Sequence, residues 1–165
     1  MLCRLSIFCF FAHLYLVEII IRPKSSIKSR QWWKKQIKAL QSLLLKHLSK
    51  NKLLLFKGSS VTLLITKNKE IQSLNNKFRT VKKPTDVLSF QLNKDEQKNK
   101  RYLGDIAISI EYAKKTACKK KIFLEEELQI LLIHGYLHLL GYNHELRKEA
   151  KIMFSLQNKL LYKLK

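Results

Sequence analysis

Three histidines lie within eleven residues near the C-terminal end of the 165-residue chain, in the segment HGYLHLLGYNH. His134 and His138 are four positions apart, so a helix places both imidazoles on one face, about one turn from each other. Gly141 follows at a spacing where a helix can end with a residue at positive φ, and the chain can then bring His144 back to the pair. The three histidines therefore predict a site for one divalent metal ion.

Three imidazole ligands leave one position of a four-coordinate metal open, which is typical of catalytic zinc rather than structural zinc. At such a position a metal lowers the pKa of a water molecule, which can then attack an electrophile. The alternative is three ordinary helical histidines near an apolar core, and the spacing of the pair together with the turning glycine disfavours it.

The spacing H-x-x-x-H-x-x-G-x-x-H is also that of the metzincin proteases, which carry a glutamate directly after the first histidine as general base. This chain has Gly135 there, and glycine cannot transfer a proton. Peptide hydrolysis by the usual route is therefore disfavoured. Glycine inside a helix costs about 1 kcal/mol relative to alanine, so we expect position 135 to need room, for example for a bulky substrate beside the metal.

The elements that must position the cluster can be read from hydrophobic periodicity and from turn residues. Ser29 is a plausible N-cap for the first helix. Strands and helices intermix without a linker, which indicates an α+β fold with one small mixed sheet packed against several helices. Helices are expected over 30–49, 68–78, 111–120, 124–140 and 145–164, and strands over 16–22, 53–56, 60–66, 87–92 and 103–110.

Composition limits the classes of protein further. The chain is 46% apolar and has a formal net charge of +21, from 33 basic and 12 acidic residues. Its length and apolar content suit one domain with a real core and exclude low-complexity disorder. The charge favours polyanionic partners such as nucleic acids, although a biased genome composition explains it equally well. The three cysteines are scattered and odd in number, so they indicate a reducing compartment rather than a disulfide scaffold.

The N-terminal segment requires a separate interpretation. Residues 5–12 read LSIFCFFA, which resembles the apolar core of a signal peptide. No small-residue cleavage site follows, and the run is well short of the roughly 20 apolar residues that a membrane-spanning helix needs. We therefore interpret residues 1–15 as an apolar extension ahead of a single domain over 16–165, and we expect a cytoplasmic protein with no membrane partner.

Three segments together resemble the YbeY endoribonucleases, also called rRNA maturation factors. The segment HGYLHLLGYNH is similar to the family signature H-G-x-L-H-L-x-G-Y-D-H. The segment FRTVKKPTDVLSF, residues 78–90, resembles the family's basic loop, and YLGDIAIS, residues 102–109, resembles its L-G-D-I strand. The order and the gaps agree, so the resemblance covers roughly residues 60–150.

The resemblance implies a zincin-like α+β fold and one Zn²⁺ per chain on His134, His138 and His144. It also implies a single-strand-specific endoribonuclease that matures the 3′ end of 16S rRNA and acts in ribosome quality control. Single-stranded RNA, rRNA and ribosomal particles would then be its partners. The functional arginine of the family's basic loop corresponds to Arg79, and a guanidinium can bind phosphate oxygens in bidentate fashion.

The chain departs from the family pattern at Asn143, where the family usually has aspartate. If that residue orients a ligating imidazole, asparagine can accept the same hydrogen bond but brings no charge. Two other functions stay open at this point. One is a metal-dependent hydrolase of another substrate, including a peptidase, and the other is a non-catalytic, ribosome-associated RNA-binding protein with a structural metal.

Overall fold

The computed structural model describes residues 17–21, 28–93, 96–97 and 101–164. A four-stranded sheet runs through it in the order β1-β2-β4-β3. β1, β2 and β4 are parallel, and β3 pairs antiparallel with β4 at one edge. The strands are β1 (Val17–Ile21), β2 (Ser60–Thr66), β3 (Val87–Gln91) and β4 (Tyr102–Ser109). The predicted α+β class with one small mixed sheet is confirmed.

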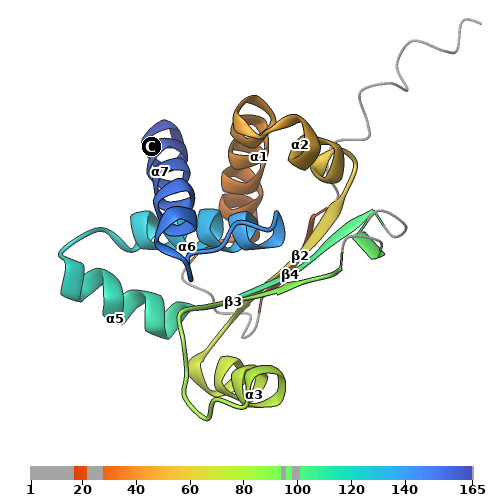
Figure 1. Cartoon of the computed structure of the whole chain (residues 1–165). Helices are drawn as coiled ribbons and strands as arrows, with labels where there is room; N and C mark the ends of the chain where they lie inside the picture. Colours follow the sequence, from red (N-terminus) through yellow and green to blue (C-terminus); the bar gives the residue numbers. More distant parts are fainter. Residues whose placement is uncertain (1–16, 22–27, 94–95, 98–100, 165) are drawn as a thin grey trace, which may run out of the picture.

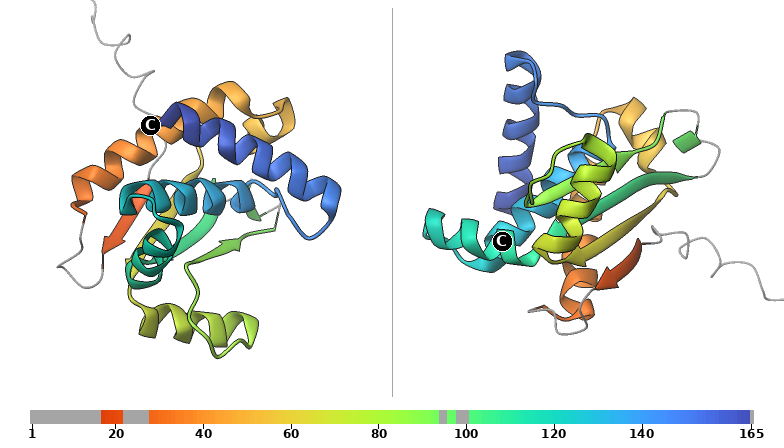
Figure 2. Two further views of the ribbon diagram at one scale, coloured as in Figure 1. Left: turned by 90° about the vertical axis from the view of Figure 1, so that its left-hand side faces the viewer. Right: turned by 90° about the horizontal axis from the view of Figure 1, so that it is seen from below.

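Helices cover the two faces of the sheet unequally. Helices α1, α6 and α7 lie on one side of the sheet and α3 lies on the other (Figure 1). In the left view of Figure 2, α1 and α7 lie side by side above α6, so α6 is enclosed between them and the sheet. The helices are α1 (Arg30–His47), α2 (Lys50–Phe56), α3 (Asn68–Arg79), α5 (Ile110–Lys120), α6 (Leu124–Leu139) and α7 (Arg147–Leu164).

The enclosed position of α6 follows from its composition. The helix is apolar nearly all round, and a helix of that kind needs cover on more than one side. Its first turn contains three consecutive glutamates, and their negative charge interacts favourably with the positive end of the helix dipole. Of these, Glu127 is buried and pairs with Lys120 of α5 at 2.8 Å. Around the partly exposed His134 and His138, the buried residues of the second half of α6 are Leu131, Leu132, Ile133, Gly135, Tyr136, Leu137 and Leu139.

The first helix begins as predicted, because the Ser29 hydroxyl accepts a hydrogen bond from the Trp32 amide at 3.1 Å. The predicted strand over 53–56 is wrong, since these residues form the end of α2. Leucine favours helices, and the run contains no β-branched residue that would favour a strand. Phe56 is anchored in the core, and Gly58 at a φ of 73° then turns the chain into β2.

The predicted extension over residues 1–15 lies outside the described residues, and so do most of the polar tract 93–100 and the ends of the predicted strand 16–22. The division into an extension and one domain stays a prediction. Within the described part of the chain, no helix combines the length and the apolar character needed to cross a membrane.

Candidate metal centre

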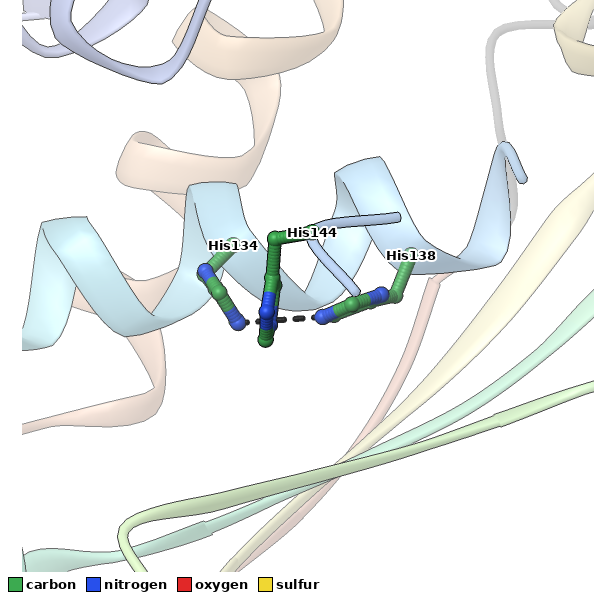
Figure 3. Close-up of side chains that lie close together, drawn as sticks. All are labelled: His134, His138 and His144. Atoms are coloured by element: carbon green, nitrogen blue, oxygen red, sulfur yellow. Dashed lines mark hydrogen bonds between the residues drawn. The ribbon is translucent and has the colours of Figure 1, made fainter. Parts of the chain in front are cut away.

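The end of α6 and the turn after it bring the three histidines together. His134 and His138 project from one face of α6, and His144 reaches toward them from the following segment (Figure 3). Gly141 has a φ of 73°, which glycine adopts without strain. Its amide donates to the His138 carbonyl at 2.8 Å, and the Tyr142 amide donates to the Leu137 carbonyl at 2.9 Å. These hydrogen bonds end the helix, and the chain reverses its direction there, as the position of Gly141 in the sequence predicts.

The geometry of the triad fits a single metal ion. The Nε2 atoms of His134 and His138 are 3.0 Å apart, and ligand atoms from all three imidazoles lie within 4.8 Å of one another. Two nitrogens bound to tetrahedral zinc at 2.0–2.1 Å are about 3.3 Å apart, so small movements complete the site. Among the described residues, this is the one group of three or more His, Cys, Asp or Glu side chains that can hold a metal. We call it the histidine triad.

The surroundings of His134 and His138 keep these two imidazoles of the histidine triad neutral. Burial lowers the pKa of His138 to about 4, and positive charge on His134, His144 and Arg79 contributes to the same shift. Burial likewise lowers the pKa of His134, and the hydrogen bond that His134 donates to Gln157 opposes this shift. Neutral imidazoles are the form that binds metal, so at neutral pH these two rings are ready to act as ligands.

Helix α7 supplies two side chains that contact the histidine triad. The Gln157 Oε1 atom lies 3.0 Å from Nδ1 of His134. The ring of Phe154 stacks on that of His144, with centroids 5.6 Å apart and an interplanar angle of 21°. Neither residue was predicted from the sequence as part of the site. A signal was available for Gln157, because it is a polar residue on the stripe of α7 that otherwise buries Met153 and Leu160.

Helix α2 supports the turn that carries His144. The Lys52 ammonium group donates a hydrogen bond to the Leu140 carbonyl at the end of α6 and lies 4.3 Å from the centroid of the Tyr142 ring. A cation at a helix C-terminus interacts favourably with the helix dipole, and a cation over an aromatic face gains further electrostatic energy. Lys52 was missed because residues after it were expected to form a strand.

A cavity of about 290 Å³ opens beside the histidine triad. Arg79 is the last residue of α3 and lines this cavity together with His138 and His144. The next residue, Thr80, has a φ of 58°, which ends the helix and leads the chain into the basic loop. Arg79 therefore lies at the same cavity as the proposed ligands. The cavity is lined by Arg79, Ser89, Gln91, His138, Asn143, His144 and Glu145.

Asn143 is exposed and lines the cavity. Within the described part of the chain, no hydrogen bond joins it to any of the three imidazoles. His134 instead bonds Gln157. In this structure the acceptor that orients the His134 imidazole is therefore Gln157 and not Asn143.

Gly135 makes room for the sheet and not for a substrate, which corrects the expectation from the sequence. It is buried on the side of α6 that faces β4. A Cβ atom at this position would lie 2.8 Å from Cγ2 of Ile106, closer than side chains normally approach. A glutamate at position 135 would therefore meet the core and not the metal, so the general base of a metzincin has no space here.

We expect Gly135→Ala to destabilise the protein by about 1–2 kcal/mol, because overpacking costs about 1–3 kcal/mol and the gain in helix propensity offsets part of it. Urea unfolding measures the change. The matched variant is Gly135→Ala combined with Ile106→Ala, which removes the clashing atoms. We expect the two substitutions to be less destabilising together than the sum of their separate effects. Strict additivity would contradict the proposed contact.

The comparisons with known proteins extend over nearly all of the described chain. A family profile described as "Endoribonuclease YbeY" matches residues 21–165. A protein named Endoribonuclease YbeY from Sulfurihydrogenibium sp. (strain YO3AOP1) is 40% identical over 139 residues, which cover 84% of this chain and 88% of that protein. A protein of the same name from Persephonella marina is 41% identical over 129 residues, covering 77% and 80%.

A solved structure resembles the fold as well. The solution structure of TM1509 from Thermotoga maritima superposes with a TM-score of 0.59 at 27% sequence identity. The match covers 90% of this chain and 89% of that one. The similarity therefore extends over most of the fold and is not confined to one segment.

Proposed function

Since the chain belongs to the YbeY endoribonuclease family, we propose that it is a zinc-dependent enzyme that cleaves single-stranded RNA during rRNA processing. The endoribonuclease activity follows from the family. The zinc ion, the preference for single strands, the 3′ end of 16S rRNA as target, ribosomal particles as partners and a cytoplasmic location are our proposals. The observation that carries the proposed zinc chemistry is the convergence of three imidazoles beside a cavity that Arg79 also lines. The proposals on target, partners and location rest on the family and on the net charge of +21.

His134, His138 and His144 are the proposed ligands of one zinc ion. When bound, zinc supplies a Lewis acid and activates water for hydrolysis. Arg79 is the proposed catalytic residue, because its guanidinium can bind phosphate oxygens and stabilise charge that develops at phosphorus. The remaining basic residues provide general affinity for the RNA backbone, in keeping with the net charge of +21.

The two alternative functions make different demands on the same site. A peptidase of the metzincin kind needs a carboxylate after the first histidine, and the close packing of Gly135 against Ile106 speaks against one. A non-catalytic RNA-binding protein needs no open metal position and no arginine in the cavity beside the metal. The geometry of the histidine triad and Arg79 supports the nuclease over both.

In the decisive experiment, the purified protein is incubated separately with a single-stranded RNA, with the same RNA as a duplex, and with an unstructured polypeptide. We expect cleavage of the single strand only, loss of cleavage with a chelator, and recovery when zinc is restored. Intact RNA in the presence of bound zinc would favour the binding protein. Digestion of the polypeptide but not of the RNA would establish the peptidase.

A further inference from the structure

We propose that Gln157 is a positioning residue that fixes the tautomer of His134 and so directs its Nε2 lone pair toward the metal. This inference rests on the proposed function, because it assigns a role within the same metal site. Gln157 lies on α7, outside the segment that carries the three ligands, and contacts Nδ1 of His134, whereas Nε2 of the same ring faces His138.

The chemistry of the contact determines where the proton of His134 resides. An amide oxygen accepts hydrogen bonds and cannot donate them. Because Oε1 of Gln157 lies 3.0 Å from Nδ1 of His134, the proton of the neutral imidazole must be on Nδ1. Nε2 then carries the lone pair, and it is the atom that faces His138.

The neighbouring imidazole presents the same atom to His134. Nε2 of His138 lies 3.0 Å from Nε2 of His134, so with the proton of His134 on Nδ1 the Nε2 lone pair of His134 is directed toward His138. A metal ion bound by both rings accepts this lone pair, and a hydrogen-bond partner on the other ring nitrogen keeps a ligating imidazole in that orientation.

The Gln157 side chain is buried, so its polar amide needs a hydrogen-bond partner. Gln157 is only 9% exposed, and its neighbours on the buried stripe of α7 are apolar. A buried amide without a partner costs free energy, whereas an apolar residue would suit the stripe without that cost. The hydrogen bond to His134 accounts for a polar side chain at this place in the helix packing.

The test compares four full-length proteins: wild type, Gln157→Met, Gln157→Glu and, as a control on the exposed side of the same helix, Asn158→Ala. Methionine keeps the length and removes the amide acceptor, while glutamate keeps an acceptor. We expect Gln157→Met to weaken zinc affinity about 10–100-fold in competition with a chelator. We expect Gln157→Glu to bind within a few-fold of wild type and Asn158→Ala to be unchanged. Wild-type affinity in Gln157→Met would overturn the inference.

A second measurement separates this inference from the metal site itself. Nitrogen-15 NMR of the metal-free protein reports which ring nitrogen of His134 carries the proton. We expect Nδ1 in wild type and Asn158→Ala, and a mixture of tautomers in Gln157→Met with its fold retained by circular dichroism. If wild type bound no zinc, the proposed function would fail and this readout would decide the role of Gln157 alone. A proton on Nε2 in wild type, or an unchanged tautomer in Gln157→Met, would overturn it.

Discussion

Replacing His138 with alanine is expected to remove the bound zinc and to lower RNA cleavage by about 10³-fold or more. The imidazole supplies one of the three clustered ligand atoms and lines the cavity, and the alanine variant retains only two of three ligands. A catalytic metal contributes several kcal/mol to transition-state stabilisation, and each 1.36 kcal/mol corresponds to a factor of ten in rate. His134→Ala should have an effect of similar size.

Elemental analysis and RNA cleavage, measured on the same preparations, check this expectation. The matched control is His47→Ala, because His47 lies on α1 and bonds the Leu43 carbonyl within its own helix. We expect one zinc ion per chain in wild type and in the His47 variant, and little or none in the two triad variants. Equal zinc in all four proteins would show that the ion is bound elsewhere.

The sequence was most informative where the relevant geometry is local. The spacing of His134 and His138 specifies one face of a helix whatever surrounds it, and Gly141 marks the reversal that returns His144. Both features are present in the structure. The Ser29 cap was predicted correctly for the same reason, since a cap involves only residues within one turn.

Interactions between distant segments were not accessible in this way. Gln157 contacts His134 only because α7 packs against α6, and Lys52 reaches the end of α6 only because α2 is a helix. The role of Gly135 depended on Ile106, a residue of β4 about thirty positions earlier in the chain. In each case the side chain was visible in the sequence, and its partner was fixed by tertiary packing.

Arg79→Ala is expected to lower the maximal rate of RNA cleavage by about 10²–10³-fold, the usual effect of removing one group that stabilises charge in a transition state. RNA affinity should fall only a few-fold, because it is distributed over many basic residues of a chain with a net charge of +21. Arg79 is exposed at the end of α3, so the free energy of unfolding should change by no more than about 0.5 kcal/mol.

A comparison of Arg79→Ala with Lys82→Ala separates the effect of the position of Arg79 from the effect of its charge. Lys82 is exposed in the same basic loop and is not among the residues that line the cavity. Lys82→Ala therefore removes one positive charge, as Arg79→Ala does, but from outside the cavity. Arg79→Lys keeps the charge beside His138 but loses the bidentate geometry, so its rate should fall between those of wild type and Arg79→Ala. Single-turnover cleavage with saturating enzyme separates the rate from binding. If Arg79→Ala and Lys82→Ala reduced rate and affinity by the same factors, Arg79 would be one backbone contact among many, and the stabilisation of charge at phosphorus would have to come from the metal site alone.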